Sequence, residues 1–298
     1  MIQKVPLILP NGISLHIKRD DLLHPVISGN KFRKLKYNLA FAKQAGFSKL
    51  VTFGGAFSNH IVAVAAAGKE FGFETIGIIR GEELESKLEN NPSLLKAISF
   101  GMKLDFVTRS QFQEKESQAF LEELQIKYGD FYLLPEGGTN DLAIQGCKEI
   151  IQDNEKQFSH ICCAVGTAGT LSGIIEASFE HQKIIGFSAL KGDFLSDVIR
   201  KFVTKTNWEI ETNYHFGGYG KVSDELISFM NSFYSNTKIP LDPVYTGKMV
   251  YGVLNKIENQ FFPENSKILM IHTGGLQGIE GMNLILKNKN KELINYGV

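Results

Sequence analysis

The chain alternates short apolar runs with longer segments that carry apolar residues every three or four positions. The short runs predict strands at 49–53, 74–79, 103–107, 131–134, 160–165, 183–187 and 267–272. The longer segments predict helices at 59–71, 112–128, 141–153 and 170–179, and a helix that begins at Asn91-Pro92. Strands separated by helices form right-handed βαβ units in parallel sheets with both faces covered. The predicted fold class is therefore α/β.

Glycine-rich turns follow four of the predicted strands. These turns are Gly54-Gly55, Gly137-Gly138, Gly166 to Gly169 and Gly274-Gly275. In open α/β sheets, ligands bind beyond the carboxyl ends of the strands. We therefore expect several of these turns to meet in one cleft.

Composition and charge narrow the class of protein. The 298 residues include 32 Lys+Arg and 32 Asp+Glu, and 43% of them are hydrophobic. This length is enough for about two domains with proper cores. The balanced charge offers no basic excess to a nucleic acid, and no apolar stretch approaches the roughly 18 residues of a membrane span. No apolar segment near the N-terminus is typical of a signal peptide. We expect a soluble, cytoplasmic protein that binds neither nucleic acid nor membrane.

The cysteines and histidines do not indicate a metal site. The three cysteines form no Cys-x-x-Cys pair, and the seven histidines include no His-Glu-x-x-His. Cys162 and Cys163 lie in an apolar run, where cysteine usually packs as a small buried hydrophobe.

The turn from Gly166 to Thr170 follows a predicted strand and begins a predicted helix. Small residues let the backbone approach an anion, and the N–H groups of a helix start favour phosphate. The turn is neither a Walker A loop nor a good dinucleotide fingerprint, because the lysine and the acidic partner of those motifs are missing. It predicts either a site for a single phosphate monoester or a tight turn without a ligand.

The segment from Ser28 to Leu35 combines a glycine with several basic residues. Its lysines are either a solvated helix face or functional groups. In the functional interpretation, Lys31 projects an amine from a helix start beside Lys34. The positive end of the helix dipole and the charge of Lys34 both lower the pKa of this amine, which suits Schiff-base chemistry.

Ser58, Asn59 and His60 begin a strongly apolar predicted helix. Ser and Asn are preferred helix caps, so these residues are either a cap or a site for a substrate carboxylate at the helix start.

Six segments together resemble one family of enzymes that use pyridoxal 5'-phosphate (PLP). They are IKRDDLLHPVISGNKFRKLKYNL at 17–39, FGGAFSNHIVAVAAAG at 53–68, LPEGGTN at 134–140, AVGTAGTLSG at 164–173, LDPVYTGKMVYG at 241–252 and MIHTGG at 270–275. They occur in family order and span nearly the whole chain. The family comprises the 1-aminocyclopropane-1-carboxylate deaminases and D-cysteine desulfhydrases of fold type II, the tryptophan-synthase-β class.

The resemblance implies which residues hold the cofactor. Lys31 is the lysine that binds PLP covalently and later handles the Cα proton, and Lys34 contacts the phosphate. The backbone of the phosphate loop completes that contact; its residues are Gly166, Thr167, Ala168, Gly169 and Thr170. Asn59 donates a hydrogen bond to the 3-hydroxyl, and Thr273 faces the pyridine nitrogen.

The resemblance also implies a substrate site. Ser58, Asn59 and His60 grip the substrate carboxylate and place Ser58 near Cα. Tyr219 and Tyr245 match the two tyrosines that flank the substrate. The implied catalytic residues are therefore Lys31, Ser58 and these two tyrosines.

Two positions bear on the choice between the family's activities. The deaminases carry Glu after the second tyrosine and Leu at the position of Thr273, whereas the desulfhydrases carry Thr or Ser at both. Here the residues are Thr246, which we expect to contact substrate, and Thr273. A hydroxyl beside the pyridine nitrogen leaves it largely unprotonated, which is sufficient when a good leaving group departs from Cβ.

The sequence thus predicts a PLP-dependent β-elimination lyase that converts D-cysteine to pyruvate, ammonia and sulfide. The alternatives are a 1-aminocyclopropane-1-carboxylate deaminase, another PLP activity such as D-serine dehydration or racemisation, and a non-catalytic PLP-binding protein. We expect a homodimer with a larger PLP-binding domain at 1–35 and 140–298 and a smaller inserted α/β domain at 36–139.

Overall fold

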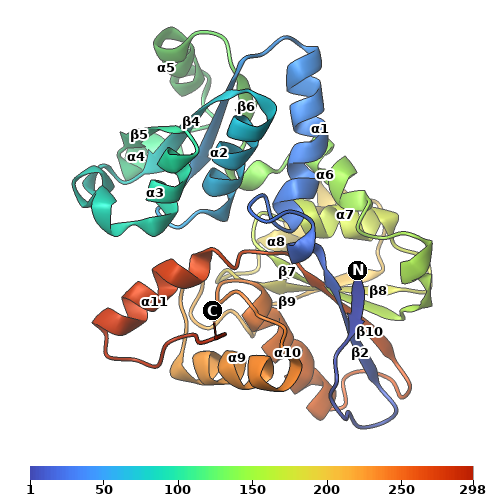
Figure 1. Ribbon diagram of the computed structural model, residues 1–298. Helices are drawn as coiled ribbons and strands as arrows, with labels where there is room; N and C mark the ends of the chain where they lie inside the picture. The colour runs from blue at the N-terminus through green and yellow to red at the C-terminus, as the bar shows by residue number, and fades with distance from the viewer. Residues whose placement is uncertain (298) are drawn as a thin grey trace.

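The computed structural model describes residues 1–297 and contains two β-sheets, each flanked by helices (Figure 1). The six-stranded sheet has the order β1 (Ile2–Lys4), β2 (Ser14–Arg19), β10 (Lys267–His272), β7 (His160–Val165), β8 (Lys183–Ser188) and β9 (Trp208–Glu211). The four-stranded sheet has the order β5 (Lys103–Val107), β4 (Glu74–Arg80), β3 (Lys49–Gly54) and β6 (Tyr132–Leu134). Every pairing is parallel except that of β1 with β2. The α/β prediction is confirmed.

Eleven α-helices connect and cover these strands within the described residues. They are α1 (Asn30–Gln44), α2 (Asn59–Phe71), α3 (Pro92–Ser99), α4 (Arg109–Gln113), α5 (Gln118–Tyr128), α6 (Asp141–Lys148), α7 (Gly169–Ala177), α8 (Leu195–Arg200), α9 (Asp224–Thr237), α10 (Thr246–Glu258) and α11 (Gly278–Asn288). Four short 3₁₀ turns lie at Asp20–Leu22, Glu82–Asn90, Glu136–Gly138 and Asp153–Gln157. No helix in residues 1–297 is both long and apolar enough to cross a membrane.

Two predicted helices are wrong in their extent. The segment 112–128 is not one helix, because the Ser117 hydroxyl accepts a hydrogen bond from the Phe120 N–H and starts α5 separately from α4. The segment 141–153 stops being α-helical at Lys148. The chain then turns so that the Ile150 carbonyl oxygen and the Glu155 carboxylate can both accept hydrogen bonds from Lys18.

The seven predicted strands are all present, but β1, β2 and β9 were not predicted. Strand β2 has the sequence Ser-Leu-His-Ile-Lys-Arg. Its polar residues interrupt the apolar pattern by which a buried strand is predicted. Lys18 and Arg19 are buried there because each pairs with a carboxylate, Glu155 and Asp21 respectively. Glu155 is remote in the chain, and the pair of Arg19 with Asp21 counts as polar in a hydrophobic pattern, so local hydrophobicity cannot reveal the strand.

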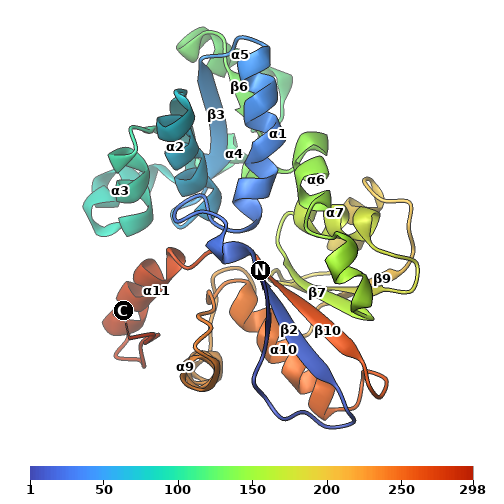
Figure 2. The ribbon, with the colours of Figure 1, turned by 45° about the vertical axis from the view of Figure 1, so that its right-hand side comes forward.

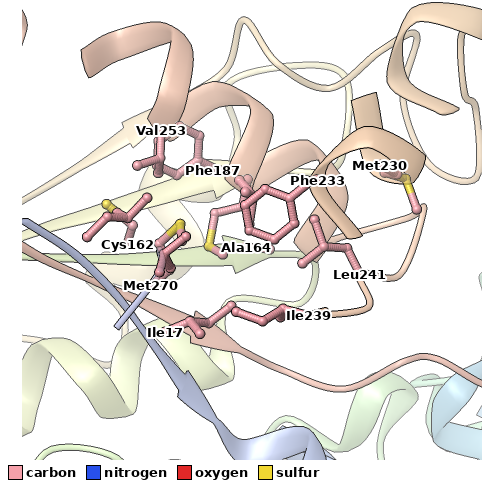
Figure 3. Packing of buried hydrophobic residues seen from close by; sticks show 14 of the residues in the cluster. Ile17, Cys162, Ala164, Phe187, Met230, Phe233, Ile239, Leu241, Val253 and Met270 are labelled. Carbon is pink, nitrogen blue, oxygen red and sulfur yellow. The ribbon is translucent and has the colours of Figure 1, made fainter. Parts of the chain in front are cut away.

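Strand β7 shows how the six-stranded sheet builds a core on both faces. Cys162 and Ala164 point toward α9 and α10, where Phe187 and Met270 of neighbouring strands join them (Figure 3). The alternate residues of β7, with Cys163 among them, point to the opposite face and pack in a second cluster with α7. Residues that alternate along a strand face opposite sides of the sheet, so the two adjacent cysteines serve different cores. Both cysteines are fully buried, as the sequence predicts.

Helix α1 connects the two sheets (Figure 2). It begins beside the six-stranded sheet, packs against α6, and continues to α2 beside the four-stranded sheet. The four-stranded sheet lies between residues 49 and 134, and the six-stranded sheet takes its strands from 2–19 and 160–272. We propose the domain boundaries near residues 35 and 140, with the first one inside α1 rather than in a linker.

The start of α1 touches the loop that follows β10. Gly29 has a φ of +64°, and a Cβ there would lie 2.0 Å from the Thr273 carbonyl oxygen. That oxygen accepts a hydrogen bond from the Asn30 N–H at 3.2 Å. Only glycine allows both the positive φ and this close approach.

We predict that Gly29→Ala destabilises the protein more than Gly46→Ala does. Gly46 also has a positive φ, +80°, but a Cβ there would meet nothing within 4 Å. The control therefore loses only about 1–2 kcal/mol of unfolding free energy from backbone strain. Gly29→Ala adds a backbone collision, and we expect a loss of about 3 kcal/mol or more in urea denaturation. Equal losses in the two variants would contradict the close contact.

Candidate active site

A cavity of about 880 Å³ lies where the loops at the carboxyl ends of both sheets meet. Gly55 follows β3, Gly137 follows β6, Gly166 follows β7 and Gly274 follows β10, and all four line it. The predicted convergence of the glycine-rich turns is confirmed. The volume of the cavity falls within the roughly 300–1,000 Å³ that is typical of ligand sites.

Lys31 lies in the cavity wall, in the first turn of α1. Burial, and next the positive charge of Lys34, lower the pKa of its amine to about 7. Its Nζ is 3.3 Å from the Asn30 side-chain oxygen. An amine with this pKa is substantially neutral at physiological pH and can act as a nucleophile or a base.

Lys34 lies one helical turn further along α1 and is 1% exposed. Its Nζ donates hydrogen bonds to the Gly137 carbonyl oxygen (2.9 Å) and to the hydroxyls of Thr139 (3.0 Å) and Thr167 (3.2 Å). The ammonium thus ties the loop after β6 to the loop after β7. Burial lowers its pKa, yet within residues 1–297 no carboxylate forms an ion pair with it. A buried cation that only neutral groups surround fits an anion such as a phosphate in the adjoining cavity.

The loop before α7 has the properties of a phosphate site. The first intrahelical bond of α7 joins the Ser172 N–H to the Ala168 carbonyl oxygen, so the N–H groups just before Ser172 have no helical acceptor. Ala168 has a φ of +63°, a rare conformation for a residue with a side chain. The side-chain amide of Asn30 donates to the Thr170 hydroxyl at 2.8 Å and fixes the loop against α1. Of the five predicted loop residues, four line the cavity, and the fifth, Gly169, packs closely against Thr139.

The start of α2 forms another part of the wall. Ser58 is the N-cap, and its Oγ accepts a hydrogen bond from the Ile61 N–H at 3.4 Å. The hydroxyl proton remains available because Oγ serves here only as an acceptor. The Asn59 side chain lies beside Gly275, whose Cβ would come within 3.0 Å of the amide nitrogen. The cap interpretation is confirmed. It is compatible with a carboxylate site, which stays a prediction, since a capped helix start also presents free N–H groups to the cavity.

His60 lines the cavity and leaves one ring nitrogen without a partner within the described residues. Thr52 uses its hydroxyl proton on the Leu134 carbonyl oxygen (2.9 Å), so it accepts the proton of His60 Nε2 (2.9 Å). Nδ1 is then an acceptor, and it is buried with no partner within the described residues. Burial and the charges of Lys31 and Lys34 hold the pKa of His60 well below its usual value. A neutral imidazole adds no third positive charge beside the two lysines.

Tyr219 and Tyr245 lie side by side at the cavity. Their ring centroids are 6.2 Å apart in an edge-to-face arrangement. Tyr245 is tightly fitted, because a Cβ on Gly166 would lie 3.0 Å from its ring. Burial raises the pKa of Tyr245 well above its ordinary value, so its hydroxyl stays protonated and can donate. Tyr219 is half-exposed and lies at the mouth of the cavity.

Thr273 lines the cavity, whereas Thr246 does not. Thr246 has no exposed surface, and its hydroxyl donates to the Asp242 carboxylate at 2.7 Å. The same carboxylate accepts hydrogen bonds from the N–H groups of Val244, Tyr245 and Thr246. Thr246 therefore supports the start of α10 and reaches substrate only through Tyr245, its neighbour in the chain. The sequence prediction of direct substrate contact by Thr246 finds no support in its position.

Sequence reasoning missed three residues that hold the site together. Asn30 connects Lys31 to Thr170, Thr139 connects Lys34 to Thr167, and Asp242 anchors Tyr245. Asn30 and Asp242 lie within segments that carry the family resemblance, which was a usable signal. Thr139 lies in such a segment too, at 134–140, but its role depends on a contact with a residue 28 positions later.

The comparisons with known proteins agree with this geometry. A model of the family described as pyridoxal-phosphate-dependent enzyme matches residues 2–274. A protein of Pyrococcus horikoshii, named provisionally as a 1-aminocyclopropane-1-carboxylate deaminase, is 32% identical over 91% of this chain and 88% of its own length. A mitochondrial protein of Arabidopsis thaliana, named a bifunctional D-cysteine desulfhydrase/1-aminocyclopropane-1-carboxylate deaminase, is 31% identical over 91% of this chain and 74% of its own.

Solved structures give the same result for the fold. A crystal structure described as a homologue of ACC deaminase superposes with a TM-score of 0.78, at 30% identity, over 93% of this chain and 90% of that one. A threonine deaminase from Solanum lycopersicum superposes with a TM-score of 0.62 at 18% identity, over 91% of this chain and 79% of that one, which shows the fold alone.

We predict that covalent attachment of PLP to the cofactor-free protein speeds up as the pH rises through about 7. Only the neutral amine of Lys31 can attack an aldehyde, and the neutral fraction grows above its pKa. Lys34→Met removes a neighbouring positive charge, so the midpoint should move upward. The rate is followed by the absorbance change of added PLP. Lys36→Met, at an exposed residue that pairs with Glu149, should leave the midpoint unchanged. A wild-type midpoint near 10 would mean that the amine is fully hydrated.

Proposed function

The chain belongs to the pyridoxal-phosphate-dependent enzymes, in the family of 1-aminocyclopropane-1-carboxylate deaminases and D-cysteine desulfhydrases, and on that premise we propose a β-elimination lyase. Its substrate is a small D-amino acid with a leaving group on Cβ, and D-cysteine is the first candidate. The products from D-cysteine are pyruvate, ammonia and sulfide. The cofactor is PLP, as in the whole family.

One observation carries the choice of reaction. Beside the Gly275 turn, the Asp242 carboxylate is fully buried and occupied by four hydrogen bonds. The hydroxyl of Thr273 makes no hydrogen bond within the described residues and lines the cavity. A hydroxyl, rather than a carboxylate, is then what the protein offers at the position that the family resemblance assigns to the pyridine nitrogen. A neutral partner favours elimination of a good leaving group over opening of a cyclopropane ring.

The residues of the chain divide the work in this proposal. When bound, PLP supplies the sink for the electron pair left at Cα. The neutral Lys31 amine removes the Cα proton, for which its pKa of about 7 is suited. The N–H groups at the start of α2 and the Ser58 hydroxyl hold the substrate carboxylate. Tyr245, whose hydroxyl stays protonated, lies on the other side as a hydrogen-bond donor.

A 1-aminocyclopropane-1-carboxylate deaminase is the second candidate. The names of several relatives favour it, and the Arabidopsis relative is named for both activities. The deaminase forms 2-oxobutyrate and ammonia from its substrate, so product analysis separates the two activities. Racemisation would give the enantiomer of the substrate, D-serine dehydration would give pyruvate and ammonia without sulfide, and a PLP-binding protein would give no product.

We predict that a panel of D- and L-amino acids identifies D-cysteine as a substrate through release of pyruvate and sulfide. Lys31→Ala should abolish this turnover and remove the visible absorbance of lysine-bound cofactor. Lys36→Met serves as the control with a surface lysine. Turnover of 1-aminocyclopropane-1-carboxylate alone would contradict the proposal, and an unchanged spectrum of Lys31→Ala would contradict the role of Lys31.

We predict that Thr246→Glu combined with Thr273→Leu weakens D-cysteine turnover. Thr273→Leu removes the free hydroxyl, and Thr246→Glu places a second carboxylate against the buried Asp242. Two buried like charges should also lower the unfolding free energy by about 3 kcal/mol. Sulfide release and urea denaturation are measured together, with Thr246→Ser as the control that keeps the hydroxyl. Undiminished D-cysteine turnover in the double variant would contradict the proposed role of these threonines.

A further inference from the structure

Arg80 is an arginine without a carboxylate partner that lines the active-site cavity. The chain has five arginines, and four of them pair with carboxylates: Arg19 with Asp21, Arg33 with Asp20, Arg109 with Glu83 and Arg200 with Asp197. Within residues 1–297, no carboxylate oxygen lies within 4 Å of the Arg80 guanidinium, and it makes no hydrogen bond there. Its charge is therefore available to a ligand in the cavity.

Neighbouring elements hold this guanidinium in place. Arg80 is the last residue of β4, at the carboxyl end where ligands bind. Its guanidinium carbon lies 5.6 Å from the ring centroid of Phe112, which is buried beneath it. On the cavity side, a Cβ on Gly55 would come within 3.5 Å of Nη2, so the glycine leaves this face open. Stacking on an aromatic ring reduces the freedom of the side chain while its N–H groups remain free to donate.

The position of Arg80 relates it to the substrate rather than to the cofactor. Gly55 lies in the loop between β3 and α2, which leads to the helix start where the proposed substrate carboxylate binds. The charge of Arg80 also acts on the Tyr219 hydroxyl at the cavity mouth. The proposed phosphate loop lies instead at the end of β7, on the other sheet. Two carboxylates, Glu116 and Glu136, also line the cavity, and Glu136 is paired with Lys115 at 3.4 Å. Neither of them neutralises Arg80 directly.

We infer that Arg80 binds an acidic group at the far end of the substrate side chain. The substrate class is then an amino acid whose Cβ carries a leaving group that ends in an anion. This inference rests on the proposed β-elimination. D-cysteine provides the reacting Cβ–S bond, and an S-substituted form with a terminal carboxylate adds the group that Arg80 recognises. A guanidinium binds such a carboxylate through two parallel hydrogen bonds.

S-Carboxymethyl-D-cysteine represents this class, and its reaction balances without a further reactant. Lys31 takes the Cα proton, the Cβ–S bond breaks, and the electron pair leaves on sulfur as mercaptoacetate. The remaining aminoacrylate takes up water and gives pyruvate and ammonia. S-Carbamoylmethyl-D-cysteine has nearly the same shape with a neutral amide, so a comparison of the two isolates the charge.

The test compares the two thioethers with D-cysteine in wild type and Arg80→Gln. We expect wild type to prefer the carboxymethyl compound over the carbamoylmethyl compound in kcat/KM. Arg80→Gln should lose about tenfold in kcat/KM for the carboxymethyl compound, mainly through KM, since the guanidinium is partly exposed and hydrated. Turnover of D-cysteine should change little. Arg80→Lys should restore part of the preference, because lysine keeps the positive charge. The rest is lost because an ammonium cannot donate the two parallel hydrogen bonds of a guanidinium.

Two control variants separate a specific site from general charge. Lys201→Gln removes another cation that lines the cavity, from the end of α8 on the opposite wall, and Arg109→Gln removes an exposed arginine that pairs with Glu83. Neither should alter the preference. Equal preference for the two thioethers in wild type, or the same loss in Lys201→Gln, would overturn the inference. An equal loss for D-cysteine in Arg80→Gln would overturn it too, since Arg80 would then hold the α-carboxylate.

A binding measurement distinguishes this failure from failure of the proposed function. If wild type does not turn over D-cysteine, the β-elimination proposal fails. Titration calorimetry of the holoenzyme with the two thioethers then still tests Arg80, because the carboxymethyl compound should bind about tenfold more tightly in wild type and equally in Arg80→Gln.

Discussion

The contact between Gly29 and the Thr273 carbonyl fixes the geometry of the whole site. Without a side chain at position 29, the start of α1 comes close enough for the Asn30 N–H to bond that carbonyl. This contact places Lys31 beside the loop after β10 and lets Asn30 reach the loop before α7. Because α1 continues to the four-stranded sheet, the same contact also sets where the two sheets meet.

The second constraint is electrostatic. Two lysines one helical turn apart are buried with few opposite charges, and the structure responds in three ways. Lys31 has a pKa lowered to about 7, Lys34 distributes its charge over three neutral oxygens, and His60 remains neutral beside them. A dianionic phosphate would resolve this arrangement, since it supplies the missing negative charge. The phosphate of PLP, the cofactor of the family, thus accounts for the two lysines that lack opposite charges.

The cavity has walls of different chemical character. The six-stranded sheet contributes the glycine-rich loop of α7 and the Thr273 turn, which suit a cofactor. The four-stranded sheet contributes the start of α2 and Arg80, which suit the charged groups of an amino acid. Tyr245 belongs to the first of these walls, because Asp242 accepts a hydrogen bond from its N–H while its ring lies against Gly166.

The sequence alone determined the α/β class, the seven buried strands and the glycine-rich turns that line the cavity. It could do so because parallel strands covered on both faces are continuous apolar runs, and because turns with positive φ, such as those at Gly137 and Gly274, need glycine. It also placed Lys31, Lys34 and Tyr245, since those residues lie in contiguous family segments. Tertiary structure alone decided that β2 is a buried strand, that Thr246 faces Asp242 instead of the cavity, and that Arg80 lacks a carboxylate. The burial of β2 depends on its pairing with β10, and a pairing between distant residues leaves no trace in the local pattern. Asp242 lies only four residues before Thr246, but the direction of the Thr246 side chain is set by the folded turn before α10.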